Sequence, residues 1–196
     1  AYSVIPSDGN LLLASDGNLY GVIGSERNRG SALFRMAPDG TVTSVYEFDP
    51  MTEGLAQTFL TLGPDGALYG LLKQANLRNA LYRVSLDGQF TNLGVFGPPM
   101  FYIKEKLTLM PDGYFYGSGK ITNQQVNILF RLSSAGEYTQ LYADPGVSSA
   151  TDLSMLIRGF DNALYGTLSN GGRDDGGVLF RYVPPSVPSP GLKRKR

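Results

Sequence analysis

The chain has 196 residues, of which 42% are hydrophobic, so it is long enough to bury a substantial core. It contains no Cys and no His, which excludes disulfides, thiolate nucleophiles and the usual Ser-His-Asp triad. The 17 basic and 17 acidic residues cancel, but the last four residues, 193–196, are all basic. Residues 1–192 therefore carry 13 basic against 17 acidic residues, a net charge of −4, and we expect the folded part to bind no nucleic acid.

A seven-residue motif recurs four times along the chain. It reads SDGNLYG at 15–21, PDGALYG at 64–70, PDGYFYG at 111–117 and FDNALYG at 160–166. A second motif follows each copy, as ALFR at 32–35, ALYR at 80–83, ILFR at 128–131 and VLFR at 178–181. The closing glycines of the first motif lie 49, 47 and 49 residues apart, and this period predicts a repeat architecture.

Each repeat predicts four short antiparallel strands. The first is an apolar run before the Asp-Gly pair, as in 60–62 and 107–109, and the second ends in Leu-Tyr-Gly. The third carries Leu-Phe-Arg, and the fourth is an alternating run at 41–48, 89–96 and 137–142. Four strands in about 48 residues is the size of a β-propeller blade. We expect an all-β fold with almost no helix.

The two ends of the chain predict how the sheets would close. The repeats span about 6–48, 55–96, 103–144 and 150–183, and the fourth runs into prolines from residue 184 onward before a fourth strand. We expect residues 1–5 to supply that strand, which closes a four-bladed propeller over 1–183. An eight-bladed homodimer and a fragment of a larger propeller are the alternatives. Residues 184–196 are expected to form a disordered basic tail.

The segment 161–182 shows a family resemblance. Its DNALYGTLSNGGRDDGGVLFRY resembles the extracellular tandem repeat of bacterial GloVer-type, or choice-of-anchor, proteins, and the likeness extends over about 8–183. The resemblance implies an exported or cell-surface β-propeller and no defined activity. We expect no membrane attachment from the residues given, because the tail shows no apolar helix of an anchoring signal, no signal peptide is visible at the start, and no apolar run is long enough to span a membrane.

The loops that differ between repeats are the candidate binding site, because binding residues are usually carried on loops over a rigid scaffold. The loops between the second and third strands, at 24–31, 73–79, 117–127 and 169–177, are rich in amide and charged side chains. The candidate ligand-binding residues are Arg27, Asn28, Arg29, Arg78, Asn79, Lys120, Gln124, Arg173, Asp174 and Asp175. Ordinary solvated loops have the same composition.

The connections between repeats are more apolar, and we expect them at the opposite end of the sheets. Met100, Phe101 and Tyr102 form a candidate protein-contact patch there, with Phe59 in the equivalent segment of another repeat. The alternative is that these side chains plug one end of the ring.

Residues kept in every repeat are expected to serve the repeat itself. The Asp-Gly and Asp-Asn pairs are explained as turns, and the four aligned tyrosines as packing between blades. The arginines Arg35, Arg83, Arg131 and Arg181 either support their own sheet or form an anion-binding ring, and we favour the first. We expect no metal and no cofactor, because Asp174 and Asp175 lack the spaced oxygens of a calcium loop.

The sequence therefore predicts a non-catalytic binding module that recognises a glycan or a protein through loops on one face. A carboxylate-dependent polysaccharide hydrolase or lyase is the first alternative, although no recognisable pair of acidic residues is evident. A structural or oligomerising propeller domain is the second.

Overall fold

The computed structural model describes residues 9–24, 30–74, 77–103, 106–144, 156–168, 174 and 176–185. These residues form four antiparallel sheets and contain no α-helix, which confirms the all-β prediction. The first sheet comprises β1 (Leu12–Leu13), β2 (Leu19–Gly24), β3 (Ser31–Met36) and β4 (Val42–Phe48), and the second comprises β5 (Leu55–Leu62), β6 (Leu68–Lys73), β7 (Asn79–Val84) and β8 (Phe90–Phe96). The third comprises β9 (Phe101–Tyr102), β10 (Thr108–Leu109), β11 (Phe115–Ile121), β12 (Val126–Leu132) and β13 (Tyr138–Asp144), and the fourth β14 (Ile157–Arg158), β15 (Leu164–Leu168) and β16 (Val178–Tyr182).

Strand pairing places the two sequence motifs side by side in every sheet. The glycine of Leu-Tyr-Gly always lies opposite the aromatic residue of the Leu-Phe-Arg motif, as in the pairs Gly21–Phe34 and Gly117–Phe130. A Cβ atom on Gly117 would lie 2.4 Å from the Phe130 ring. The glycine is therefore required by the close approach of this ring, not by its backbone angles.

The core lies between the sheets. One buried cluster joins the first and second sheets around Leu33 and Leu60, and a second joins the second and third sheets around Leu81 and Phe115. A third cluster, which includes Leu156, joins the third and fourth sheets. Sheet-on-sheet packing of this kind is what β-propeller blades do.

Polar contacts between neighbouring sheets fix their relative position. Asn10 donates its side-chain amide to the Leu60 carbonyl at 3.2 Å and accepts from the Leu60 N–H at 2.9 Å. The Thr61 hydroxyl donates to the Leu107 carbonyl, and the Thr108 hydroxyl makes the same contact with the next sheet. A repeated sequence position thus makes a repeated bond across two junctions.

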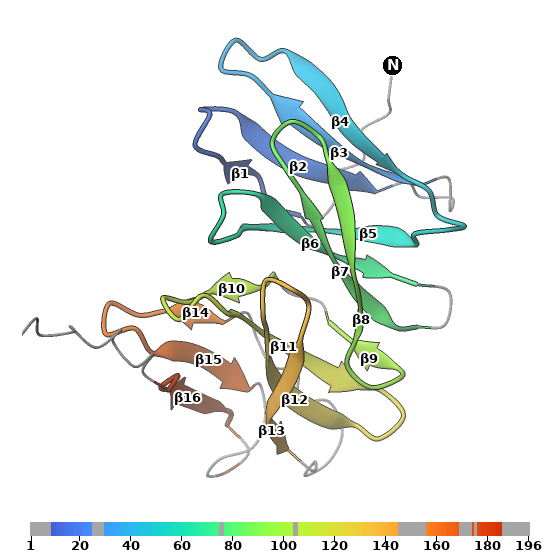
Figure 1. Cartoon of the computed structure of the whole chain (residues 1–196). Helices are drawn as coiled ribbons and strands as arrows, with labels where there is room; N and C mark the ends of the chain where they lie inside the picture. Colours follow the sequence, from blue (N-terminus) through green and yellow to red (C-terminus); the bar gives the residue numbers. More distant parts are fainter. Residues whose placement is uncertain are drawn as a thin grey trace, which may run out of the picture.

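The described sheets form an open, curved row. Figure 1 shows β1–β4 and β14–β16 at its two ends, with the other sheets between them. None of the three core clusters joins the fourth sheet to the first within the described residues. The predicted four-bladed closure through residues 1–5 lies outside the described part of the chain and stays a prediction.

Two sheets differ in strand number. The fourth has three strands in the described residues, as the prolines after 183 predict. The third has a divided inner strand, because both β9 and β10 pair with β11. The third sheet therefore begins at Phe101, two residues before the predicted start of its repeat. No helix that could cross a membrane occurs among the residues described.

Candidate functional site

The loops between the second and third strands of each sheet lie at the same end of the molecule as the connections between sheets. The Asn79 side-chain amide, at the end of the β6–β7 loop, donates a 2.6 Å hydrogen bond to the Phe101 carbonyl in β9. The expectation that these two sets lie at opposite ends is wrong. In a four-stranded up-and-down sheet the first and third turns share one end, so the second turn and the connection to the next sheet share the other.

A cavity of about 500 Å³ opens between the second and third sheets at this end. This volume is within the range of small-molecule and oligosaccharide sites. The lining residues are Gln57, Thr58, Phe59, Lys73, Leu77, Asn79, Met100, Phe101, Tyr102, Ile103 and Thr122. They come from three segments far apart in the sequence, which are brought together by the packing of the two sheets.

A bulge in β5 forms one wall of this pocket. Ala56 pairs with Leu72, whereas Leu60 pairs with Gly70, so β5 holds two more residues than β6 over the same interval. Bulges of this kind redirect side chains away from the regular sheet positions. Gln57, Thr58 and Phe59 occupy the bulge and contribute to the pocket lining.

The second wall is formed by β9 and the residue before it. Met100 has a φ of 59°, a left-handed conformation that a side chain rarely adopts. Its carbonyl accepts hydrogen bonds from the backbone N–H and the hydroxyl of Thr122, at 3.1 and 3.2 Å. These two bonds attach the start of β9 to the end of β11 and hold Met100 at the pocket.

The polar part of the lining is centred on Asn79. This side chain is buried, and its Oδ1 accepts a 3.3 Å hydrogen bond from Gln57 Nε2 while its amide donates to Phe101. A buried amide that uses both ends in this way is held in one orientation. Asn79 therefore positions the Gln57 amide and the β9 backbone together.

Tyr102 and Lys73 form the rim. The Lys73 ammonium lies 5.9 Å from the centre of the Tyr102 ring, a cation–π distance, and Tyr102 is 48% exposed. Among the described residues that line the pocket, Lys73 is the only charged one. The described lining thus offers an aromatic surface, amide and hydroxyl groups and one cation.

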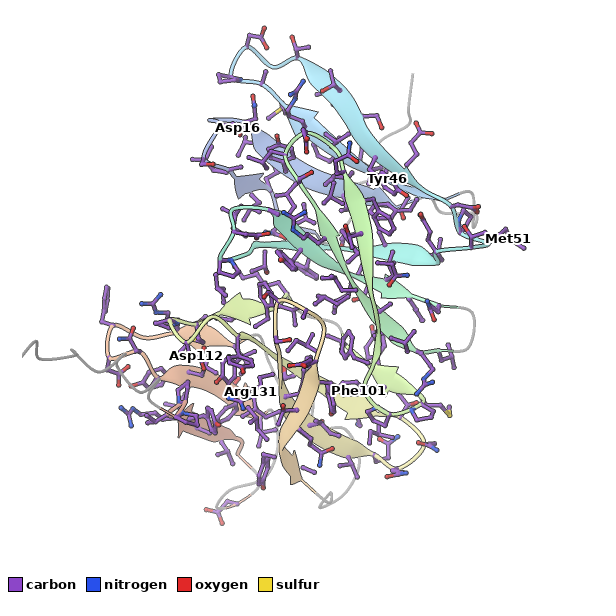
Figure 2. The ribbon with its side chains drawn as sticks, viewed as in Figure 1. Asp16, Tyr46, Met51, Phe101, Asp112 and Arg131 are labelled. Atoms are coloured by element: carbon purple, nitrogen blue, oxygen red, sulfur yellow. The ribbon has the colours of Figure 1, made fainter. Side chains whose placement is uncertain are left out.

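Four of the predicted site residues meet at this pocket: Asn79 of the loop set, and Met100, Phe101 and Tyr102 of the apolar set. Phe101 is buried against Phe130 rather than exposed, so it belongs to the core below the pocket and not to a contact patch. Phe101 is labelled in Figure 2 and belongs to β9 of the third sheet.

The other predicted residues do not line the pocket. Arg78 precedes Asn79. Lys120 lies on β11, where it pairs with Tyr102 of β9, and Gln124 lies in the β11–β12 turn. Asp174 lies in the fourth repeat, apart from the pocket lining. Arg27, Asn28, Arg29, Arg173 and Asp175 lie outside the described residues.

Sequence reasoning did not single out Gln57, Thr58, Lys73, Leu77, Ile103 and Thr122. Their spacing resembles that of ordinary strand and turn residues. The one signal in the sequence is the length of the segment between Gly54 and the Leu-Thr-Leu run at 60–62. This segment has more residues than a regular strand needs to pair with its neighbour.

The aligned arginines serve their own sheets, as favoured from the sequence. Arg83 Nε donates to Asp65 Oδ2 at 2.7 Å, and Arg181 makes the same ion pair with Asp161. Arg131 lies 4.3 Å from the centre of the Tyr114 ring. Among the residues with described placement, no group of three Asp, Glu, His or Cys residues could hold a metal ion.

Comparison with known proteins gives a fold and no family. No protein-family model matches the sequence, and no curated protein matches it. Among solved structures, a protein from Lactobacillus plantarum is similar with a TM-score of 0.54 and 17% identity, over 85% of this chain and 54% of that one. An exo-β-1,3-galactanase from Clostridium thermocellum has a TM-score of 0.53 and 15% identity, over 87% and 44% of the two chains.

A quinoprotein alcohol dehydrogenase-like protein from Bacteroides thetaiotaomicron is also similar, with a TM-score of 0.50 and 16% identity, over 68% of this chain and 33% of that one. The chain thus spans between a third and about half of the length of these structures. At these identities the likeness concerns the fold alone. The chain has an all-β, propeller-like fold.

Proposed function

We propose that the chain is a non-catalytic binding module that recognises a glycan in the pocket between the second and third sheets. The observation that carries this proposal is the 500 Å³ cavity with the half-exposed Tyr102 at its rim. The C–H face of a sugar ring is apolar and packs on an aromatic side chain. The hydroxyl groups of the sugar require the amides and hydroxyls that the lining supplies.

The sugar would lie across the pocket from Tyr102 toward the bulge in β5. In this arrangement Gln57 and Thr122 face the ring hydroxyls, and Met100 covers the apolar edge. Lys73 provides a cation at the rim, which favours a glycan that carries a carboxylate, such as a uronic acid.

We also propose, on the resemblance of the repeats to GloVer-type proteins, that the module acts outside the bacterial cell. An extracellular location would expose the pocket to surface or matrix polysaccharides. Fractionation of the producing cells tests this point, and recovery of the protein only from the cytosol would contradict it.

Isothermal titration calorimetry with neutral and uronate-containing oligosaccharides tests the binding proposal. We expect binding of at least one oligosaccharide, tighter for the uronate-containing ones, and a loss of on the order of tenfold to a hundredfold in affinity for Tyr102→Ala. Tyr142→Ala is the matched control, because Tyr142 is also exposed and lies outside the pocket.

Three outcomes would contradict the proposal. One is the absence of binding to every oligosaccharide together with capture of a peptide ligand at the same pocket. Another is glycan binding that Tyr102→Ala and Lys73→Ala leave unchanged. The third is the release of shorter products from any oligosaccharide, which would favour a hydrolase or lyase.

A further inference from the structure

The leucine of the Leu-Phe-Arg motif is buried in three sheets and exposed in the fourth. Leu33, Leu81 and Leu129 each lie against the following sheet and are almost inaccessible to solvent. Leu179 occupies the same motif position in β16 and is 73% exposed. Ile157 on β14 of the same sheet is exposed too. We call this surface, defined by Ile157 and Leu179, the trailing face.

A second leucine shows the reverse pattern. It lies ten residues before the glycine of each Leu-Tyr-Gly motif. Leu60, Leu107 and Leu156 are buried against the preceding sheet, whereas Leu11 in the first repeat is 55% exposed. Leu13 beside it is also exposed. We call this surface, defined by Leu11 and Leu13, the leading face.

Within the chain, these two leucines always meet. Each junction buries one leucine of each kind in the same core cluster, in the combinations Leu33 with Leu60, Leu81 with Leu107, and Leu129 with Leu156. The trailing face is therefore shaped to receive a leading face. In the described residues, one trailing face and one leading face are left over, at opposite ends of the row of sheets.

We propose that two copies of this chain associate head to tail, with the trailing face of each packed on the leading face of the other. A second copy is the occupant that presents a leading face with the right register, because the same repeat encodes both sides of every junction. Apolar side chains that are exposed at the two ends of one chain are then buried at two equivalent junctions.

The curvature of the row supports closure at two copies. The sheets of this chain lie in a curved row (Figure 1), and the chain spans 54% of the length of the similar structure from Lactobacillus plantarum, with a TM-score of 0.54. We infer that the four sheets of one chain make up about half of a closed ring. Two copies related by a two-fold axis complete such a ring with eight sheets, and the symmetry makes both junctions identical. This proposal does not depend on the glycan pocket, which lies inside one chain.

Light scattering and sedimentation velocity of the 196-residue chain test the association. We expect a dimer of about 42 kDa, twice the 21.2 kDa of one chain. Leu179→Glu and Leu11→Glu, each alone, should weaken the dimer on the order of a hundredfold, because each places a charge in both junctions. Circular dichroism should show that both variants remain folded, since both side chains are exposed in the single chain.

Met51→Glu is the matched control. Met51 is 90% exposed, lies between β4 and β5, and belongs to neither end face; Figure 2 shows it at the outer edge of the molecule. This substitution adds the same charge at an exposed apolar residue and should leave the dimer unchanged.

Cross-linking tests the head-to-tail arrangement directly, because the chain contains no other cysteine. The variant with both Leu11→Cys and Leu179→Cys should give a covalent dimer with a short bis-maleimide, and each single variant should remain uncross-linked. A monomer at every accessible concentration would overturn the proposal. Cross-linking of the Leu179→Cys single variant with itself would also overturn it, because that product requires two trailing faces in contact. Covalent products larger than a dimer would overturn it too.

Discussion

The hydroxyl group of Tyr116 donates a 2.7 Å hydrogen bond to Asp112 Oδ2, and this contact recurs in every sheet. The equivalent bonds are Tyr20 to Asp16 at 2.8 Å, Tyr69 to Asp65 at 3.4 Å and Tyr165 to Asp161 at 3.0 Å. In the second and fourth sheets the arginine on the neighbouring strand, Arg83 or Arg181, also bonds to this aspartate. Figure 2 labels Asp112 of the third sheet. The repeat motif thus encodes a tyrosine that packs between sheets and also fixes the turn.

Tyr116→Phe should destabilise the protein by about 1–2 kcal/mol, because it removes a hydrogen bond to a carboxylate at a mostly buried position. Tyr165→Phe is the matched comparison, since its bond to Asp161 is exposed, and it should cost less. Chemical denaturation measures both. An equal loss for the two variants would show that burial does not set the strength of this contact.

Acid should weaken the protein through the carboxylates of these turns. Hydrogen bonds from the Arg181 guanidinium, the Ala163 N–H and the Tyr165 hydroxyl lower the pKa of Asp161 to about 2. Because the folded-state pKa is below the unfolded value of about 4, this stabilisation is present above pH 4 and is lost as the pH falls toward 2. Thermal unfolding at a series of pH values should show this decline, and Arg181→Gln should make it shallower. An unchanged slope in that variant would contradict the assignment.

The elements of the sheets could be read from the sequence because each depends on neighbours in the same repeat. Asp16 accepts a hydrogen bond from the Asn18 N–H, and Gly17 has a φ of 79°, so the Asp-Gly turn is specified by two adjacent residues. The alternation that follows specifies the strands. These signals are local, and the first three sheets contain all four predicted strand types.

The pocket could not be read in this way, because it depends on contacts between repeats. Asn79 and Phe101 are 22 residues apart, and the bulge that brings Gln57 toward them results from an excess of length in β5. Leu33 and Leu179 show the same limit. They occupy the same motif position, and only the presence of a following sheet makes one buried and the other exposed.

Tyr82→Phe should stabilise the protein by about 1 kcal/mol. The Tyr82 hydroxyl is fully buried and has no hydrogen-bond partner among the described residues, and burial raises its pKa. A buried polar group without a partner costs free energy that its removal recovers. The other three repeats already have phenylalanine at this position, so the cavity accommodates the smaller ring. A decrease in stability would show that the hydroxyl has a partner, such as a buried water molecule.

Gly117→Ala should destabilise the protein by about 1–3 kcal/mol, because the new methyl group would lie 2.4 Å from the buried Phe130 ring and 2.8 Å from Leu107. Gly24→Ala is the matched control, since it lies at the end of a strand with no atom within 4 Å and an ordinary backbone conformation. It should change the stability little or raise it slightly. Equal losses would mean that strand glycines act through flexibility and not through contact with the ring.

Asn79→Ala should increase local opening of the backbone at the pocket more than it increases global unfolding. The substitution leaves the Phe101 carbonyl without its 2.6 Å donor at a buried position, a loss of about 1–3 kcal/mol. Because this bond ties β9 to the second sheet, hydrogen exchange should rise first in residues 100–103, ahead of the strands that do not contact Asn79. Gln57→Ala removes only the longer 3.3 Å bond to the same amide and should raise exchange less. Exchange that rises equally throughout the third sheet would mean that β9 is held by its pairing with β11 alone, and that Asn79 has no part in shaping the pocket.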